Sequence, residues 1–227
     1  MRPIATNLQT VLARIADAAR MAGRSPASVR LLAVSKTWPL ADAEEAALAG
    51  QHAFGENYVQ EGVEKAITRP DLEWHFIGPL QSNKTRPVAE HFAWVHTVDR
   101  LKIAERLSAQ RPADLPPLQV CVQVNVSGEA SKSGCAPDEA LALCQAVARL
   151  PNLQLRGLMA IPEPTDDPAA QRAPFRALRE LQENIIASGI TLDTLSMGMS
   201  HDLEAAIAEG ATIVRIGTAI FGERNYA

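Results

Sequence analysis

The feature that most constrains the fold is an alternation of short apolar segments with longer amphipathic ones, which continues to the end of the chain. The short segments are rich in Val, Ile and Leu and have the length of buried strands. We expect eight strands, at Val29–Ser35, His52–Gly55, Glu73–Ile77, Trp94–Val98, Leu118–Val126, Gln154–Ile161, Thr194–Met197 and Thr212–Ile216.

Helices are expected between these strands, because apolar residues recur there at steps of three and four. Gly50, Gly189 and Gly210 stand where helices should end, and Pro137 suits a first helical turn. The expected helices are Leu40–Ala49, Tyr58–Thr68, Asn83–His91, Leu101–Gln110, Pro137–Leu150, Pro168–Ser188 and His201–Glu209.

This order of elements implies a parallel sheet, because parallel strands need long crossover connections. Eight strands are the number that closes into a (β/α)8 TIM barrel, which we predict as a single domain over residues 1–227. The alternative is an open doubly wound sheet. Its usual fingerprint, GxGxxG after the first strand, is missing from this sequence.

The N-terminal segment is expected to form an additional helix that ends at Gly23. Its apolar stripe consists of Leu8, Val11, Leu12, Ile15 and Ala19. Since no long helix is expected after the eighth strand, we expect residues 1–25 to pack on that part of the barrel.

Composition argues against several classes of function. The net charge of −4 and a pI near 5.8 argue against a broad surface for nucleic acid or anionic membranes. The apolar runs are far shorter than the roughly 18 residues of a membrane helix. Three cysteines without a CxxC pair, and no secretory signal, indicate reduced thiols and a cytoplasmic protein. The histidines show no metal-ligand spacing, so no metal is expected, and His75 is expected in the core.

Polar residues and glycines gather at the C-terminal ends of the expected strands, which form the active face of such a barrel. Alternation along the first strand places Leu32, Val34 and Lys36 on one face. If that face is the barrel interior, Lys36 rises from the core into the mouth, where partial desolvation makes an amine nucleophilic toward carbonyls. The alternative is a lysine that extends past the strand into solvent.

The eighth strand ends in a comparable way, with Ile213 and Arg215 on one face. An inward arginine needs an acceptor, which could be a pyridine nitrogen, a carboxylate or the partner in a structural ion pair. Gly217 and Thr218, together with Ser196–Ser200, predict a phosphate cradle, since barrels frequently bind phosphate after strands seven and eight.

For two residues near these strand ends, the sequence leaves more than one role or position open. Ser200 also suits the N-cap of the helix that follows it. Asn125 shares a face with Cys121 and Gln123, and points into the mouth if the valines of that strand pack outward. Otherwise Asn125 lies at a solvated strand end.

Nine blocks of sequence follow one another in a specific order. They are Ala33–Thr37, Phe54–Glu61, Trp74–Lys84, Val95–Asp99, Gln123–Glu129, Lys132–Gly134, Gly157–Pro162, Leu195–Ser200 and Val214–Gly222. With these blocks the chain resembles the YggS/PROSC family of pyridoxal 5′-phosphate (PLP) homeostasis proteins, from about Leu31 to Arg224.

The resemblance implies a barrel of the fold type III class of PLP proteins, like the N-terminal domain of alanine racemase, without a C-terminal β domain. It implies that Lys36 forms a Schiff base with PLP, that Arg215 faces the pyridine nitrogen and that Asn57 lies beside the ring. The residues implied to hold the phosphate are Ser200, Gly217 and Thr218. Further cofactor contacts are expected from Met199, Asn125, Ser196 and Lys132.

Three residues have smaller expected roles. Lys132 and Lys84 are candidates for a secondary contact with PLP during its transfer. His201 departs from the family, where related sequences often carry a small or acidic residue. We expect His201 to contact the start of the following helix more than the cofactor.

The expected function is to hold PLP and deliver it to PLP-dependent apo-enzymes without catalysis. Alanine racemases of this fold carry a second domain that donates a tyrosine base, whereas this sequence stops at Ala227 and its tyrosines are Tyr58 and Tyr226. The alternative is a low-activity PLP-dependent amino-acid racemase, and a third hypothesis is a sugar-phosphate barrel enzyme. We expect a monomer with no nucleic-acid or membrane partner.

Overall fold

The computed structural model describes residues 3–128 and 133–223 of the chain. Its centre is a closed barrel of eight parallel strands, in which β8 pairs back with β1. The strands are β1 (Arg30–Val34), β2 (Ala53–Glu56), β3 (Glu73–Phe76), β4 (Trp94–Val98), β5 (Leu118–Gln123), β6 (Leu153–Met159), β7 (Thr194–Ser196) and β8 (Ile213–Ile216). The predicted barrel is confirmed, and strand ends differ from the predicted ones by three residues or fewer.

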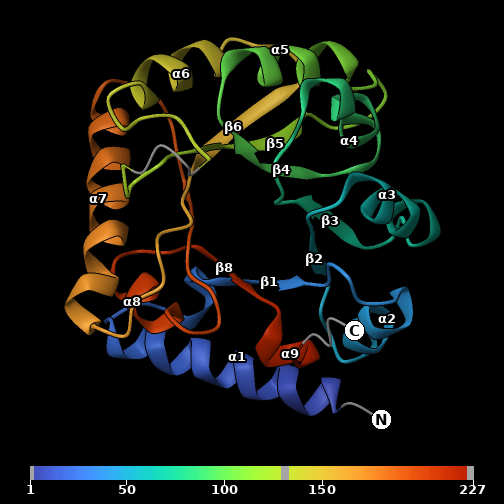
Figure 1. The fold of residues 1–227 in the computed structure, drawn as a ribbon, viewed down its shortest axis with the longest axis vertical. Coiled ribbons are helices and arrows are strands. Elements are labelled where there is room, and N and C mark those ends of the chain that lie inside the picture. The colour runs from blue at the N-terminus through green and yellow to red at the C-terminus, as the bar shows by residue number, and fades with distance from the viewer. Residues whose placement is uncertain (1–2, 129–132, 224–227) are drawn as a thin grey trace.

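Helices surround the barrel, one after each strand from β1 to β7 (Figure 1). They are α2 (Leu40–Leu48), α3 (Val59–Thr68), α4 (Thr85–His91), α5 (Leu101–Gln110), α6 (Ala140–Val147), α7 (Pro168–Ala187) and α8 (Leu203–Ala208). Short 3-10 turns, η1 (Pro26–Ser28) and η2 (Ser82–Lys84), precede β1 and α4. All seven expected helices are therefore present.

Four helices start later than predicted, α3 by one residue, α4 and α8 by two residues and α6 by three. α6 starts at Ala140 because Pro137 lies in a turn, in which the side chain of Glu139 accepts the backbone N–H of Ala136 at 3.1 Å. α8 starts at Leu203 and not at position 201, for a comparable reason described below. A proline or a serine that suits a helix start does not by itself fix where the helix starts.

A four-residue helix, α9 (Thr218–Phe221), follows β8 directly and was not predicted. It is too short to show the periodicity on which helix prediction depends. Its N-cap is Gly217, so the first turn of α9 begins at the C-terminal end of the barrel.

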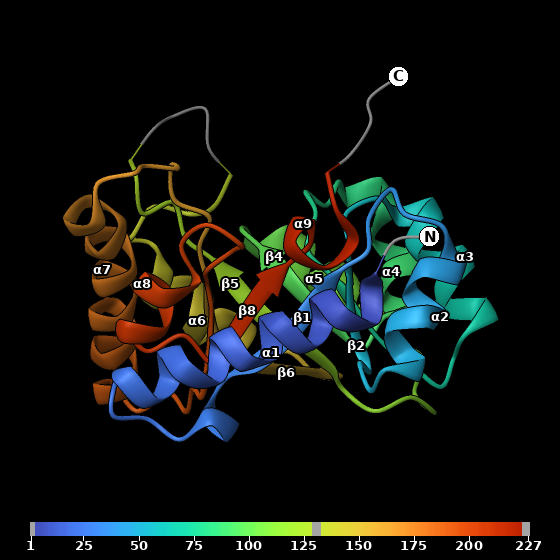
Figure 2. The ribbon, with the colours of Figure 1, turned by 90° about the horizontal axis from the view of Figure 1, so that it is seen from below.

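The N-terminal helix α1 (Ile4–Met21) packs along α8 and α9, beside β8 and β1 (Figures 1 and 2). Asn7 Nδ2 donates to the carbonyl oxygen of Ile220 at 3.0 Å, and Arg24 Nη1 donates to that of Ile207 at 2.7 Å. One residue of the predicted apolar stripe, Leu12, is instead 38% exposed. The buried stripe of α1 includes Ile4 and Ala18 in place of Leu12.

Apolar side chains form two cores, one on each side of the strands. The larger core lies between the strands and the helices and includes Trp74 and Phe76. The smaller core consists of Leu32, Val34, Ala53, Ile77, Trp94, Cys121, Met159 and Ile213. Strand alternation places this smaller core inside the barrel, where His75, His96 and Arg215 share the same face. The inward direction predicted for the first and eighth strands is thus confirmed.

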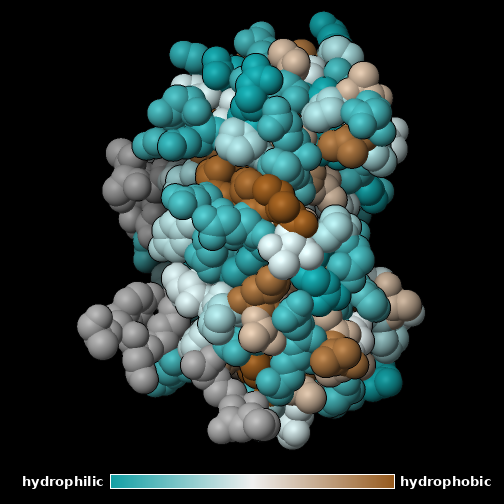
Figure 3. Space-filling view, turned by 90° about the vertical axis from the view of Figure 1, so that its right-hand side faces the viewer, coloured by the Kyte–Doolittle hydropathy of each residue, from teal (hydrophilic) through white to brown (hydrophobic). Residues whose placement is uncertain are grey.

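The surface in Figure 3 is mainly hydrophilic, with apolar residues in separate patches. Over residues 3–128 and 133–223, no helix has both the length and the apolar character needed to cross a membrane. In the same part of the chain, no three His, Cys, Asp or Glu side chains group as metal ligands would. Cys121, Cys135 and Cys144 are buried without a disulfide, and burial raises the pKa of each thiol, which disfavours the reactive thiolate.

Candidate functional site

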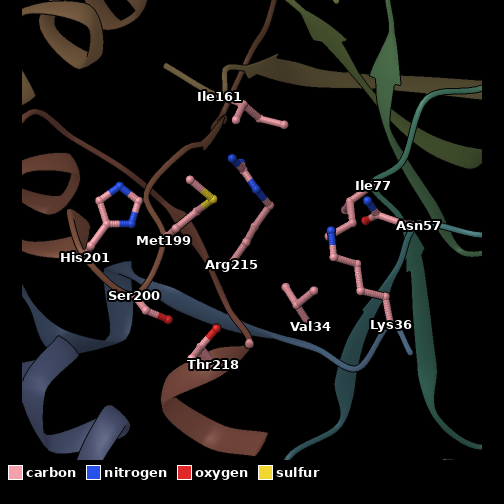
Figure 4. A pocket seen from close by; sticks show the side chains of 11 residues that line it. Val34, Lys36, Asn57, Ile77, Ile161, Met199, Ser200, His201, Arg215 and Thr218 are labelled. Carbon is pink, nitrogen blue, oxygen red and sulfur yellow. The ribbon is translucent and has the colours of Figure 1, made fainter. Parts of the chain in front are cut away.

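A cavity of about 290 Å³ opens at the C-terminal ends of the strands, where the active face of a barrel is expected. It is lined by Val34, Lys36, Asn57, Ile77, Ile161, Met199, Ser200, His201, Arg215, Gly217 and Thr218. Figure 4 shows Lys36, Asn57 and Ile77 on one side of the cavity and Met199, Ser200 and His201 on the other, with Arg215 between them. Segments distant in sequence therefore form one site.

Lys36 lies in a tight turn directly after β1. The backbone N–H of Trp38 donates to the carbonyl oxygen of Ser35 at 3.1 Å, so Lys36 and Thr37 are the central residues of the turn. Thr37 has a φ of 66°, a left-handed conformation that β-branched residues rarely adopt. The side chain of Lys36 is half-buried and extends into the cavity (Figure 4).

Arg215 lies at the base of the cavity and is 4% exposed. Its Nη1 donates to Ser196 Oγ at 2.8 Å, and its Nη2 donates to the carbonyl oxygen of Ala160 at 2.9 Å. Among the described residues no carboxylate forms an ion pair with Arg215. A structural ion pair, one of the acceptors that the sequence left open for this arginine, is therefore not found in that part of the chain. Burial lowers the pKa of Arg215 to about 10, so the guanidinium remains charged at neutral pH.

A series of hydrogen bonds, which we call the histidine chain, leads from Arg215 through Ser196, His96 and His75 to Glu73. The distances are 2.8 Å from Arg215 Nη1 to Ser196 Oγ, 2.7 Å from Ser196 Oγ to His96 Nδ1, 2.8 Å from His96 Nε2 to His75 Nδ1, and 2.5 Å from His75 Nε2 to Glu73 Oε1. Because the Ser196 oxygen accepts from Arg215, its O–H donates to His96, and each ring then donates from Nε2. The donors and acceptors match when both rings are neutral.

The pKa shifts along the histidine chain agree with neutral rings for His75 and His96. Burial lowers the pKa of His75 and lowers that of His96 well below its ordinary value. Burial alone would raise the pKa of Glu73, but hydrogen bonds from His75 and Arg30 bring it down to about 2. The chain thus joins a carboxylate at the start of β3 to a guanidinium in the cavity through two neutral rings.

The wall opposite Lys36 comes from the loop between β7 and α8. Gly198 has a φ of 97° and turns the chain, and a Cβ there would lie 2.6 Å from Ala206 Cβ. Asp202 Oδ1 then accepts the backbone N–H of Met199 at 2.6 Å, which shapes a turn ahead of α8. Ser200 is therefore not the N-cap of this helix; the N-cap is Asp202.

The structure brings together seven of the residues predicted to contact a cofactor. Those that line the cavity are Lys36, Asn57, Met199, Ser200, Arg215, Gly217 and Thr218. Ser196 lies beneath the cavity, fully buried between His96 and Arg215. Asn125 does not line it, because β5 ends at Gln123 and the Asn125 side chain accepts the N–H of Gly128 in the following loop.

Of the two lysines predicted as secondary contacts, the structure describes Lys84, which does not line this cavity. Lys84 ends the turn η2 and is exposed. Lys132 lies outside the described residues. His201 contacts the start of α8, as predicted, with Nε2 3.3 Å from Asp202 Oδ2. It also lines the cavity, which the sequence did not predict.

Apolar lining residues were missed as site residues, although strand alternation could have found them. Val34 lies two residues before Lys36 on the inward face, and Ile77 ends the third predicted strand. A second cavity of about 220 Å³ adjoins the first and shares Asn57, Ile77 and Ile161 with it. The mouth therefore has room beyond the Lys36 cavity.

The profile of the family described as alanine racemase, N-terminal domain, matches residues 6–225. The chain is 66% identical to a pyridoxal phosphate homeostasis protein of Pseudomonas aeruginosa, over 100% of this chain and 98% of that protein. It is 55% identical to the pyridoxal phosphate homeostasis protein of Escherichia coli K12, over 100% of this chain and 99% of that protein.

Solved structures show the same likeness. The structure of PipY from Synechococcus elongatus with PLP bound has a TM-score of 0.80 and 40% identity, covering 92% of this chain and 100% of that one. Alanine racemase from Corynebacterium glutamicum has a TM-score of 0.72 and 19% identity, covering 97% of this chain and 61% of that one. The second likeness shows the fold alone.

Proposed function

The chain belongs to the alanine racemase N-terminal domain family and, within it, to the pyridoxal phosphate homeostasis proteins; from this premise we propose that it binds PLP in the cavity at the barrel mouth, through Lys36. The amine of Lys36 and the buried guanidinium of Arg215 line this cavity, and no carboxylate is among its described lining residues. This observation carries the proposal. Such a lining suits an anionic aromatic aldehyde. Lys36 Nζ would hold the aldehyde carbon as a Schiff base, with the carbonyl oxygen lost as water.

The residues present fit the parts of PLP. Gly217 and Thr218 lie at the start of α9, where backbone N–H groups without helical partners favour an anion, and Ser200 lines the same cavity from the loop before α8. These three residues would hold the phosphate. Asn57 Oδ1 is buried and, within the described residues, has no hydrogen-bond partner. This acceptor suits the ring hydroxyl. Arg215 would donate to the ring nitrogen.

The proposed role is to hold PLP and hand it to PLP-dependent apo-enzymes, without catalysis. PLP supplies an electron sink to enzymes that use it, and a sink works best with a protonated ring nitrogen. Arg215 is a donor only, so its contact would keep a proton off that nitrogen. We also propose a monomer in the cytoplasm, where the three buried thiols would stay reduced.

The experiment that tests PLP binding compares the visible absorption of the purified protein with that of Lys36→Ala, each after dialysis and addition of PLP. We expect a Schiff-base band in the wild type that is absent in Lys36→Ala and retained in Lys84→Ala, which changes an exposed lysine. Reduction with borohydride and mass spectrometry would then locate the label on Lys36. A wild type without the band would contradict the proposal and favour the sugar-phosphate enzyme.

Hand-over is tested by mixing the PLP-loaded protein with an apo-enzyme in the presence of a phosphatase that destroys free PLP. Recovery of enzyme activity under these conditions would support direct delivery, and loss of recovery would indicate simple release. If Lys84 and Lys132 form a secondary contact, Lys84→Ala and Lys132→Ala should slow recovery and leave PLP binding unchanged. Unchanged transfer rates would remove that role.

One observation favours the alternative function, an amino-acid racemase of low activity. His201 lines the cavity on the side opposite Lys36, so two groups that can move a proton lie on opposite sides of it (Figure 4). Racemisation needs an acid and a base on opposite faces of the substrate. Turnover of L-alanine that is lost in His201→Ala would establish this activity, and its absence in the wild type would exclude it for that substrate.

A further inference from the structure

Lys36 is held in a turn whose backbone is strained. Thr37 follows it with a φ of 66°, a left-handed conformation that is unfavourable for an L-residue. Such a conformation persists only where surrounding contacts hold it. The contact on Thr37 is explicit: its backbone N–H donates to Glu61 Oε1 at 2.8 Å.

Glu61 is itself held by a buried lysine. Lys65 Nζ donates to Glu61 Oε1 at 2.7 Å, to Glu56 Oε1 at 2.8 Å and to the carbonyl oxygen of Ser35 at 2.9 Å. These three bonds use all three protons of the ammonium group. Ser35 Oγ also donates to Glu56 Oε1, at 2.6 Å. We call Ser35, Glu56, Glu61 and Lys65 the lysine brace.

The lysine brace forms hydrogen bonds with both peptide groups that flank the Lys36 Cα atom. Ser35 contributes the carbonyl of the peptide before Lys36, and this carbonyl accepts from Lys65. Thr37 contributes the N–H of the peptide after Lys36, and this N–H donates to Glu61. Fixing both peptide planes fixes φ and ψ of Lys36, and with them the direction in which its side chain leaves the backbone.

The position of the lysine brace argues that it serves more than packing. The side chains of Lys65 and Glu56 are 6% and 0% exposed. Buried ion pairs are often no more stabilising than apolar residues of the same volume, because both charges lose their hydration. Burial accordingly raises the pKa of Glu56 although Lys65 lies beside it. What an apolar cluster lacks is the ability to hold a carbonyl and an N–H on either side of one residue.

We propose that Glu61, held in place by Lys65, is a positioning residue that fixes the Lys36 turn so that the amine faces the cavity. This inference rests on the proposed attachment of PLP to Lys36. Glu61 is suited to the role because it lies one helical turn before Lys65 on α3, so that one helix carries both sides of the contact.

The test follows the rate at which the Schiff-base band forms after PLP is added to PLP-free protein. Glu61→Ala removes the acceptor for the Thr37 N–H and should slow band formation by about tenfold or more, the factor expected for a lost hydrogen bond to a charged group. Glu61→Gln keeps a carbonyl oxygen at the same place and should stay within about threefold of the wild type. Glu64→Ala, an exposed neighbour on α3 that contacts Gln60, is the matched control and should be unchanged.

Thermal unfolding of each variant separates positioning from folding. Glu61 is partly exposed, so we expect Glu61→Ala to remain folded. A Glu61→Ala protein that forms the band at the wild-type rate would overturn the inference, as would equal slowing in Glu61→Gln and Glu61→Ala. Failure of the proposed function would give a different result. In that case the wild type would show no Schiff-base band, or Lys36→Ala would retain the band.

Discussion

Two buried polar systems lie beneath the cavity, and they are built from different chemistry. The lysine brace consists of charged groups, with one ammonium between two carboxylates, and lies where β1 and β2 meet helix α3. The histidine chain runs through the barrel interior, where two neutral rings and a hydroxyl separate Arg215 from Glu73. The first holds a piece of backbone, and the second holds a charged side chain.

The difference shows how the cavity side chains Lys36 and Arg215 are each held in one orientation. A turn with a left-handed threonine needs strong, short contacts on its backbone, and ionised partners provide them. A buried guanidinium with no carboxylate partner among the described residues keeps its full charge available to a ligand. Neutral acceptors fix its orientation and do not neutralise it.

The largest expected effect comes from breaking the lysine brace. Lys65→Met should lower the free energy of unfolding by about 3–5 kcal/mol, because it leaves Glu56 buried without its cation. Urea unfolding measures this loss. The double variant Lys65→Met/Glu56→Gln should recover part of it, since the remaining partner is then neutral. A loss below about 1 kcal/mol would show that the brace contributes little to folding.

An intermediate effect is expected on the other side of the cavity. Arg215→Met should weaken PLP binding by about tenfold to a hundredfold, the range for loss of a hydrogen bond to a charged group. Its effect on stability should be smaller than that of Lys65→Met, because no partner carboxylate among the described residues loses its cation. Titration with PLP and urea unfolding measure the two quantities.

The control for this comparison is Arg86→Met, which changes an exposed arginine of α4 paired with Glu90. It should alter neither PLP affinity nor stability beyond a few tenths of a kcal/mol. Unchanged PLP affinity in Arg215→Met would show that PLP does not contact Arg215. The histidine chain would then have no role in PLP binding.

The effect expected to be smallest near neutral pH is a dependence of stability on pH that belongs to the histidine chain, and it grows as the pH falls. Burial lowers the folded-state pKa of His75 and His96, whereas an unfolded histidine takes up a proton near pH 6.5. The unfolded state therefore binds more protons below pH 6.5, so the stability is fully present above that pH and is lost as the pH falls. Each neutral histidine contributes up to about 1.4 kcal/mol per pH unit.

Urea unfolding between pH 7 and pH 5 measures this slope. His96→Gln should reduce it by up to the contribution of one histidine, and His52→Gln, at an exposed position, should leave it unchanged. Equal slopes in the wild type and His96→Gln would show that His96 is not held neutral. Lys65→Met is no control for this slope, because burial raises the pKa of Glu56 and loss of the Lys65 ammonium would raise it further.

Much of this protein could be predicted from its sequence. The alternation of short apolar runs with helical ones fixes the strands and their order, because each strand of a parallel barrel reads as one buried segment. Period-two alternation places Lys36 and Arg215 on inward faces, and the resemblance to the PLP homeostasis family assigns their roles. Seven of the predicted cofactor residues line one cavity.

Only the tertiary structure decided the partners of these residues. His75 and His96 are predicted from sequence only as core or scattered histidines, yet Ser196, a hundred residues after His96, connects them to Arg215. Lys65 reads as an ordinary helical lysine four residues after Glu61, and it is buried beneath the turn that carries Lys36. Local sequence sets which face a side chain occupies. Which side chains meet across a closed barrel depends on strand register and helix packing, and these are set by contacts among distant segments.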